Sequence, residues 1–375
     1  MSGPAIGDEG MDDEADTGRP VVGAAGYAIR REAASPIAID YLAMAYLVVT
    51  GGLAVLSGTA VGLRLALAHL VAVGLVLALA HRPVPTRRLP AFFRVAYPLA
   101  AMPLLYLELA TLNQLQFLGY FDPVVQGWEA ALFGSQLSVD ASRWIPSLWV
   151  SELMHMGYFS YYFIVPGAAI AVFMGREVAG LERLAFTVSL AFLVCYTCFA
   201  VFPVAGPRYE FPPIDGPQVN GVFFALVHRI LEGGSSKGTA FPSSHVAAAV
   251  AAWLATRQES PLAFRIVAPF AATLLLGTVY GRFHYGVDAA AGLLVAWCCH
   301  RAAPWLIGRL GAAGAPRDGR TGRETEGLGG ASLVTADASP AAADASPAAA
   351  DASPAAADAS PAARANPEDA PGNPA

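Results

Sequence analysis

Two short stretches hold the side chains best suited to chemistry, residues 241–245 (FPSSH) and 282–288 (RFHYGVD), and each stands at the start of an apolar run. The four-residue spacing of His284 and Asp288 predicts that the imidazole and the carboxylate share one face of a helix. A carboxylate in that position can hold one ring nitrogen and leave the other free to attack an electrophile or accept a proton. His245 supplies a second imidazole, which is able to donate a proton to a leaving group.

Candidate anion-binding groups accompany these histidines. Arg208, in the sequence PVAGPRY, carries a planar guanidinium that matches phosphate oxygens. Ser243 and Ser244, with the first amides of the helix that follows them, are typical of an anion site at a helix N-terminus. Arg282 and Lys237, the only lysine in the chain, are further candidate cations. Cationic donors, a nucleophilic histidine and an acid histidine together indicate phosphoryl transfer, with no metal ion or cofactor required.

The composition is that of a polytopic membrane protein. Hydrophobic residues make up 55% of the chain and charged residues only 14%, whereas soluble proteins average about 25% charged residues. The charges lie mostly outside long apolar runs, and the acidic residues lie mostly in the two tails. We therefore expect an all-α helical bundle in a membrane and find no support for nucleic acid binding. Neither the composition nor the motifs indicate an oligomeric state.

We predict eight membrane spans, of which about six form the core that carries the motifs. They cover residues 38–58, 65–81, 94–113, 152–174, 183–203, 244–256, 266–282 and 286–303. Residues 114–151 are too interrupted to span, and their aromatic and apolar content predicts short helices at the membrane interface between the third and fourth spans. Asp122, Glu129 and Asp140 in this segment could contact a substrate head group, but exposed charges on interfacial helices are the favoured interpretation.

The arginines predict the orientation of these spans. They gather in the even-numbered connections and beside the first and last spans, so the positive-inside rule places both termini in the cytoplasm. Both histidine motifs then lie at the outer face of the plasma membrane. We expect one membrane-embedded domain, residues 37–310, between two disordered tails: the acidic residues 1–36 and residues 311–375, which contain a repeated ADASPAA sequence.

The three motifs PVAGPRY, FPSSH and TVYGRFHYGVDAAAG resemble those of the type 2 phosphatidic acid phosphatase superfamily. They look closest to the branch that contains the inositol phosphorylceramide synthases, that is, to inositolphosphotransferase-like proteins. The resemblance covers about residues 95–305. It implies a membrane-embedded enzyme that hydrolyses or transfers a phosphate-linked lipid head group.

The resemblance also implies a role for each candidate residue. His284 would form a phosphohistidine intermediate and Asp288 would orient its ring. His245 would protonate the leaving oxygen, while Arg208 and the two serines of FPSSH would hold the phosphate of a lipid phosphate or phospholipid substrate.

The sequence departs from the superfamily's usual pattern at three places. Ser244 stands where the second motif commonly has glycine, although backbone amides there could still point at phosphate. Thr278 stands where the third motif usually has arginine, and Arg282 could supply that charge from another direction. The first motif usually has a lysine seven residues before its arginine, but nothing basic precedes Arg208 at that spacing, and Lys237 is the candidate substitute.

Other functions fit parts of the same pattern. A non-catalytic protein that binds or transports lipid phosphates would keep the anion site without turnover, although no internal repeat typical of transporters is apparent. A hydrolase could use His245, His284 and Asp288 as zinc ligands. A serine hydrolase could be built from one serine of FPSSH with His284 and Asp288. Haloperoxidase activity is disfavoured because the haloperoxidases of this superfamily are soluble.

Overall fold

Helices form nearly all the regular structure of the protein in the computed structural model, which describes residues 36–175 and 178–313. In chain order the α-helices are α1 (Ala38–Leu56), α2 (Ala60–Ala80), α3 (Arg88–Gln116), α4 (Asp122–Phe133), α5 (Leu137–Trp144), α6 (Leu148–Phe159), α7 (Tyr161–Met174), α8 (Val178–Val201), α9 (Pro207–Glu210), α10 (Val222–Gly234), α11 (Ser244–Glu259), α12 (Pro261–Tyr280) and α13 (Gly286–Ala313). A short 3₁₀ helix, η1 (Pro217–Asn220), precedes α10. The all-α prediction is confirmed, while the predicted tails lie almost entirely outside the described residues.

Six of these helices are long and apolar enough to cross a membrane: α1, α2, α3, α8, α12 and α13 up to Gly311. The helices α6 and α7 pass the same test only as a pair, and they are bent by 47° at the break between them. The described residues thus contain six spans, or seven if the bent pair counts as one. The chain is a multi-pass membrane protein, as predicted, but not every predicted span is a full-length helix.

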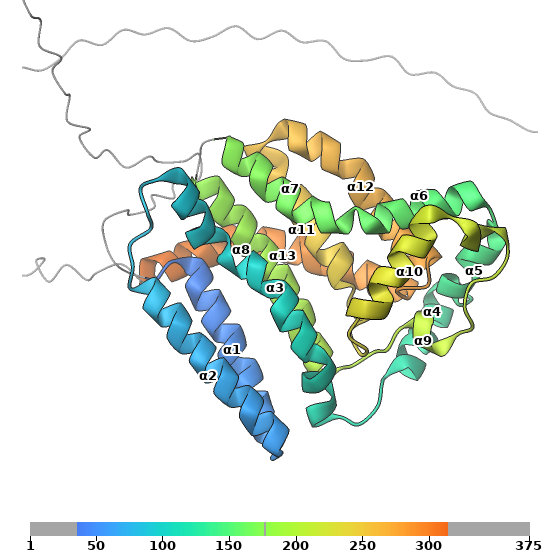
Figure 1. The fold of residues 1–375 in the computed structure, drawn as a ribbon, viewed down its shortest axis with the longest axis horizontal. Coiled ribbons are helices and arrows are strands. Elements are labelled where there is room, and N and C mark those ends of the chain that lie inside the picture. The colour runs from blue at the N-terminus through green and yellow to red at the C-terminus, as the bar shows by residue number, and fades with distance from the viewer. Residues whose placement is uncertain (1–35, 176–177, 314–375) are drawn as a thin grey trace, which may run out of the picture. The chain divides into compact units, whose positions relative to one another are not determined.

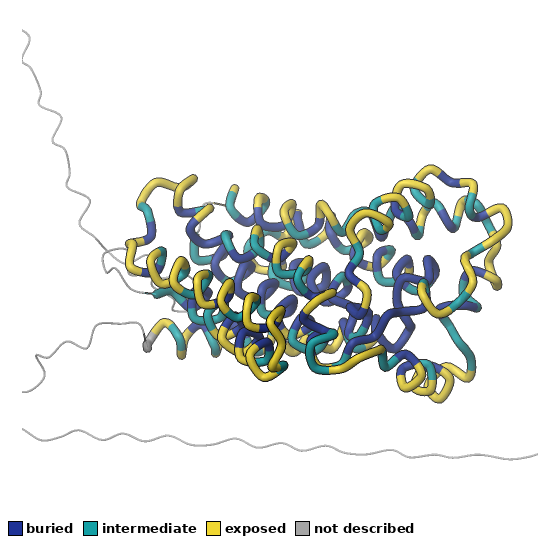
Figure 2. The backbone as a smooth tube through the Cα atoms, turned by 60° about the horizontal axis from the view of Figure 1, so that its bottom comes forward, coloured by how far each residue is buried: buried dark blue, intermediate teal, exposed yellow. Residues whose placement is uncertain are grey.

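The predicted sixth span, α11, is too short to cross the hydrocarbon core of a bilayer. Its 16 residues cover about 24 Å at 1.5 Å per residue, less than the ~30 Å hydrocarbon core of a bilayer. It packs against α7, α8, α12 and α13, and Figure 2 shows buried backbone running through the middle of the helical bundle. The alanines that make these close contacts are fully buried: Ala247, Ala248, Ala249, Ala251 and Ala252. Since neighbouring helices enclose α11, lipid does not set its length.

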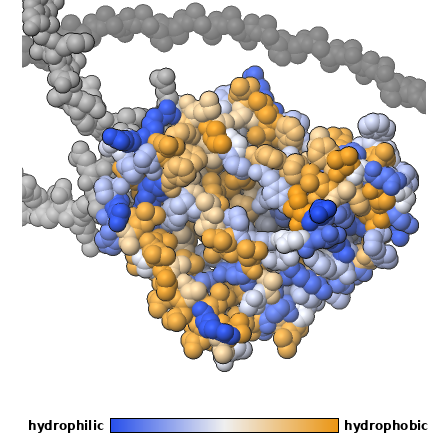
Figure 3. Space-filling view, viewed as in Figure 1, coloured by the Kyte–Doolittle hydropathy of each residue, from blue (hydrophilic) through white to orange (hydrophobic). Residues whose placement is uncertain are grey.

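The helices differ greatly in how much surface they leave for lipid. On α8, large side chains such as Leu184 and Phe186 are completely buried. On α2, leucines such as Leu67 and Leu75 are 60% and 67% exposed, and Figure 3 shows apolar side chains gathered over the α1–α3 side of the molecule. Leucines that are exposed on a membrane helix can contact lipid instead of water. The exposed α2 therefore lies at the periphery of the bundle, and the buried α8 lies at its centre.

Short helices gather at one end of the bundle. Figure 1 shows α4, α5, α9 and α10 at this end, while the α2–α3 and α11–α12 connections lie at the opposite end. Short helices in residues 114–151 are thus confirmed, as α4 and α5. The interpretation of their acids as exposed is wrong for Asp122 and Glu129, which are 1% and 0% exposed, because both accept hydrogen bonds from backbone amides. Asp140 is partly exposed and lies 4.0 Å from Arg143.

Candidate active site

His284 lies in the turn between α12 and α13, and its ring is held from one side. The backbone amides of Phe283 and His284 both donate to the carbonyl of Thr278, which shapes the turn. The His284 Nδ1 atom lies 2.9 Å from the Ala240 carbonyl oxygen and 3.5 Å from Oδ2 of Asp288. Nδ1 therefore carries the proton and donates a hydrogen bond to the Ala240 carbonyl, and Nε2 has a free lone pair.

Asp288 lies in the first turn of α13 and is completely buried. Its Oδ2 accepts a hydrogen bond of 2.8 Å from the Tyr285 amide, while its Oδ1 is buried and finds no partner in the part of the chain that the structure describes. The predicted proximity of His284 and Asp288 is present in the structure, but the predicted shared helix face is wrong, because α13 begins only at Gly286 and His284 lies in the turn before it. Because the Ala240 carbonyl is the nearer acceptor, Asp288 lies beside the ring, where it can stabilise a positive charge that develops on the imidazole.

His245 is the second residue of α11 and faces His284 directly. Its Nδ1 lies 3.5 Å from Nε2 of His284, and the Tyr158 hydroxyl lies 3.2 Å from its Nε2. Tyr161 packs on the same ring with the centroids 4.4 Å apart. Since Nε2 of His284 is an acceptor, His245 donates from Nδ1 and accepts from Tyr158 at Nε2. The two predicted histidines, 39 residues apart in the chain, thus meet at one place.

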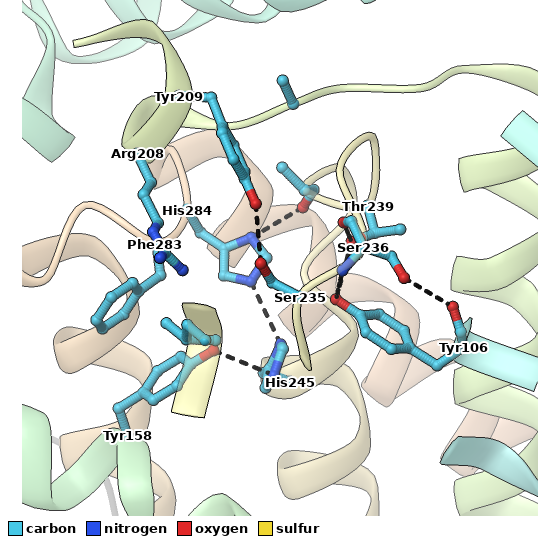
Figure 4. A pocket seen from close by; sticks show the side chains of 13 residues that line it. Tyr106, Tyr158, Arg208, Tyr209, Ser235, Ser236, Thr239, His245, Phe283 and His284 are labelled. Carbon is cyan, nitrogen blue, oxygen red and sulfur yellow. Dashed lines mark hydrogen bonds between the residues drawn. The ribbon is translucent and has the colours of Figure 1, made fainter. Parts of the chain in front are cut away.

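A small cavity of about 40 Å³ opens beside the two histidines. A cavity that holds one water has a volume of about 10–15 Å³ on the same scale. This cavity therefore has room for a group about the size of one phosphoryl. Figure 4 shows Arg208 reaching toward His284 from α9, and Nη1 of Arg208 is buried with no hydrogen-bond partner among the described residues. The residues around the cavity are Tyr106, Tyr158, Ala205, Arg208, Tyr209, Leu231, Ser235, Ser236, Thr239, Ala240, His245, Phe283 and His284. A half-buried guanidinium that keeps one buried N–H group free beside two imidazoles suits an anionic ligand.

The two serines of FPSSH are close to the cavity but do not line it. Ser243 caps α11, because its hydroxyl accepts a hydrogen bond from the Val246 amide. Its own amide donates to the carbonyl of Asp288 at 3.0 Å. A side chain at Gly292 would lie 2.6 Å from the Ser243 carbonyl, so the absence of a side chain there lets α13 approach α11. Ser243 and Ser244 are both buried, and the backbone contacts of Ser243 help to fix the start of α11 against α13.

Arg282 and Lys237 are not brought to the cavity. The guanidinium of Arg282 donates to the carbonyl of Pro212 at 2.6 Å and, more weakly, to the α5 groups Val139 O and Ser142 Oγ. Burial lowers its pKa from the usual value. Arg282 therefore connects the turn before α13 to α5 and to the loop after α9. Its Nη1 and Nη2 groups donate to oxygens of these segments, and Arg282 does not line the cavity.

Lys237 is exposed at the rim. Its Nζ lies 4.6 Å from the ring centroid of Tyr120 and 5.3 Å from that of Tyr209. Tyr209 lines the cavity and Lys237 does not, so the structure does not bring Lys237 to the place of the basic residue that the first motif lacks.

Several hydroxyl groups of the cavity wall are not among the residues predicted from the sequence. Tyr106 lies within 3.1 Å of the Thr239 hydroxyl and also accepts a hydrogen bond from the Ser236 amide. Tyr209 and Ser235 are joined by a hydrogen bond of 2.8 Å. Tyr106 is hidden in an apolar span, and a tyrosine in the middle of such a span was the available signal. The serines directly precede Lys237, in a loop without periodicity.

A model of the PAP2 superfamily matches residues 129–302, a segment that includes Arg208, His245, His284 and Asp288. A search of curated proteins and a search of solved structures each found no match. Helices α1–α3, with Tyr106, lie outside the matched segment. Over slightly less than half of its length, and over the part that carries both histidines, this membrane protein is similar to the PAP2 superfamily, a similarity that suggests a phosphatase-type activity on lipid phosphates.

Proposed function

We propose that the chain is a membrane-embedded lipid phosphatase or phosphotransferase that works through a phosphohistidine on His284. The observation that carries the proposal is the meeting of two imidazoles at a phosphoryl-sized cavity beside Arg208, whose Nη1 is buried and unpartnered. The match to the PAP2 superfamily supports the same class of substrate.

The first chemical step would be attack on phosphorus by the Nε2 lone pair of His284. As the N–P bond forms, the bond from phosphorus to the leaving oxygen breaks, and His245 in its protonated form gives that oxygen a proton. The negative charge of the bound phosphate favours this protonated form. His284 still carries its Nδ1 proton, so the phosphorylated ring is cationic, and Asp288 at 3.5 Å stabilises the charge.

The second step would release the phosphoryl group. Neutral His245 takes a proton from the attacking oxygen, the new O–P bond forms, and the N–P bond breaks with its electron pair returning to His284. Water as the attacking group gives hydrolysis, and an alcohol gives head-group transfer. An acceptor alcohol is what the resemblance to the inositolphosphotransferase-like branch would imply. Throughout, Arg208 would bind the phosphoryl oxygens that the two histidines leave free.

We place this chemistry at the outer face of the plasma membrane. Arg82, Arg87 and Arg257 lie at or next to the α2–α3 and α11–α12 connections, which Figure 1 shows at the end of the bundle opposite the short helices. By the positive-inside rule that end is cytoplasmic. The cavity, lined from α9, α10 and the turn before α13, then opens on the other side, with the lipid tails remaining in the bilayer.

The test is release of phosphate, or exchange of the head group, from lipid phosphates by the purified protein in detergent. Activity should be inhibited by vanadate and should survive exhaustive chelation, which separates this chemistry from a zinc hydrolase. His284→Ala should lower the rate by at least ~10³-fold. His81→Ala, at the exposed end of α2, is the matched control. Full activity of the His284→Ala protein would overturn the proposal, and lipid binding without turnover would favour the non-catalytic alternative.

A further inference from the structure

Two carboxylates of α4 reach into the elements that carry the candidate site. Asp122 and Glu129, two helical turns apart, are 1% and 0% exposed. No described Lys, Arg or His forms an ion pair with either of them. A buried carboxylate that lacks a cation needs hydrogen-bond donors around it, so the donors show what each carboxylate holds.

Asp122 joins the segment that leads into α9 to the turn before α13. The Ala205 amide donates to Oδ2 at 2.7 Å, and the Gly206 amide donates to Oδ1 at 2.8 Å. The Tyr285 hydroxyl donates to the same Oδ1 at 2.9 Å. The amides belong to the two residues before α9, which carries the cation of the cavity, and Tyr285 directly follows the proposed nucleophile.

The segment held by Asp122 also contacts the group that holds His284. The Ala240 amide donates to the Val204 carbonyl at 2.9 Å, and the Ala240 carbonyl accepts the Nδ1 hydrogen bond of His284. Gly206 has a positive φ of 97°, and a side chain there would meet Cβ of Ala240 at 3.1 Å. Residues 204–206 and Ala240 therefore fit together closely, and the Asp122 hydrogen bonds fix one side of this assembly.

Glu129 holds the start of α13 in the same way, by accepting hydrogen bonds from backbone amides. Its Oε2 accepts a hydrogen bond from the Val287 amide at 3.1 Å, one residue before Asp288. Its Oε1 accepts one from the Ser138 amide at the start of α5. Each carboxylate of α4 thus divides its two oxygens between separate backbone amides, and α4 is bonded to both catalytic segments.

We propose that Asp122 is a positioning residue, which holds the Ala205 and Gly206 amides so that the guanidinium of Arg208 faces Nε2 of His284 across the cavity. This inference rests on the proposed function. The matched superfamily segment begins at Glu129, so Asp122 lies outside it. Its role follows from the contacts of this chain.

Asp122→Asn is the most specific variant, because it keeps the size of the side chain and removes one acceptor. The two amides bond to different oxygens, so in asparagine one N–H would face the NH₂ group instead of an oxygen. The segment before α9 would then shift, and Arg208 with it. Asp140→Asn, the same change on the partly exposed face of α5, is the matched control.

The experiment measures vanadate binding by calorimetry, steady-state kinetics and thermal unfolding for the full-length wild type and both variants in detergent. We expect Asp122→Asn to weaken vanadate binding at least tenfold and to lower kcat/KM by about 100-fold, the scale of a 1 Å misplacement. Asp140→Asn should match the wild type in both. Wild-type vanadate affinity in a folded Asp122→Asn protein, with only its melting temperature lowered, would overturn the positioning role.

Two further results keep this test apart from that of the proposed function. A wild type that binds vanadate but transfers no phosphate would overturn the enzymatic proposal, and the affinity comparison would still decide the role of Asp122. If Asp122→Asn does not fold, hydrogen exchange of the wild type decides instead. Slow exchange of the Ala205 and Gly206 amides would support the positioning role of Asp122, and exchange as fast as that of an exposed loop would overturn it.

Discussion

The Nε2 atom of His284 lies 3.5 Å from Nδ1 of His245, so in the structure the lone pair of the proposed nucleophile faces the N–H of the proposed acid. An in-line transfer needs more room. Attack starts with the reacting atoms about 3 Å apart, and the leaving oxygen lies about another 3 Å from its proton donor. The cavity beside the rings can hold a phosphoryl group, but the group fits in line between the two ring nitrogens only when the rings move apart.

Vanadate should separate the two imidazoles. We expect a vanadate-bound structure to show the nearest ring nitrogens of His245 and His284 more than about 6 Å apart, with an oxygen of the anion bonded to Arg208. Tyr158, which holds the far side of His245, should follow this movement or lose its hydrogen bond. A bound anion that leaves the 3.5 Å contact in place would contradict the assignment of nucleophile and acid.

His245→Ala should reduce the rate according to the leaving group. An alkoxide leaving group needs a proton, so loss of the acid should cost about 10²–10⁴-fold with a lipid phosphate. A nitrophenolate leaves without protonation, so p-nitrophenyl phosphate should lose far less. Rates for a series of aryl phosphates of different leaving-group pKa measure this difference. Because His245 also acts in the second step, the comparison uses kcat/KM, which reports the first step, and an equal loss of kcat/KM with every substrate would show that His245 does not act as the acid.

The two arginines singled out in the sequence should respond differently to replacement by lysine. Arg208→Lys removes the planar fork beside the cavity, so KM and the inhibition constant of vanadate should rise by 10-fold or more while the melting temperature changes little. Arg282→Lys breaks the hydrogen bonds to Pro212, Val139 and Ser142, and hydrogen bonds of charged groups are worth about 1.5–3 kcal/mol each. It should lower the melting temperature and leave KM near the wild-type value.

Steady-state kinetics and thermal unfolding of both proteins check this pair of predictions, and each variant is the control for the other. A rise in KM for Arg282→Lys with an unchanged melting temperature would place that arginine in the phosphate site after all.

The residues for which the sequence was sufficient are those whose role depends on local spacing. His284 and Asp288 lie within one turn of chain, and the apolar runs around them predict helices directly. The sequence also predicted the short helices of residues 114–151 from their interruptions. These features require no knowledge of which helices are neighbours.

What the sequence could not supply are contacts between distant segments. Asp122 pairs with amides 83 and 84 residues away, and a carboxylate on a short helix has the same local pattern whether it meets water or backbone N–H groups. Arg282 lies only two residues before His284, but its guanidinium bonds to Pro212 and to α5. The sequence predicts α11 as a short span, but its composition does not reveal that other helices enclose it.

Glu108→Gln should weaken the contact between α2 and α3, because it removes the charge and one of the two oxygens that face His69, and it should not affect catalysis. Nε2 of His69 on α2 lies 3.0 Å from a Glu108 oxygen on α3, and its Nδ1 lies 3.2 Å from the Thr50 hydroxyl on α1. Polar contacts between membrane helices are worth about 0.6–1.7 kcal/mol, so the free energy of unfolding should fall by about 1 kcal/mol. Glu108 lies about 200° around α3 from Tyr106 of the cavity wall, so kcat/KM should stay unchanged.

Thermal unfolding in detergent measures this loss, and Leu107→Ala, which removes an exposed side chain beside Glu108, is the control. A large drop in kcat/KM for folded Glu108→Gln would instead connect this pair to the active site.

Acid should destabilise the protein partly through His228 on α10. Burial, with a smaller contribution from the charge of Arg208, lowers the pKa of His228 below its ordinary value of 6.5. Below about pH 6.5 the unfolded chain therefore binds this proton more readily than the folded one, and stability falls as the pH drops. Above about pH 7.5 the ring is neutral in both states and contributes no pH dependence.

His228→Gln should reduce the slope of melting temperature against pH between about pH 6.5 and 5, because it removes the group that must take up a proton on unfolding. His81→Gln, which changes an exposed imidazole at the end of α2, should leave the slope as it is in the wild type. The measurement is thermal unfolding in one detergent across this pH range at constant ionic strength. An unchanged slope in His228→Gln, or an equal change in both variants, would show that burial of the His228 ring does not govern the acid sensitivity.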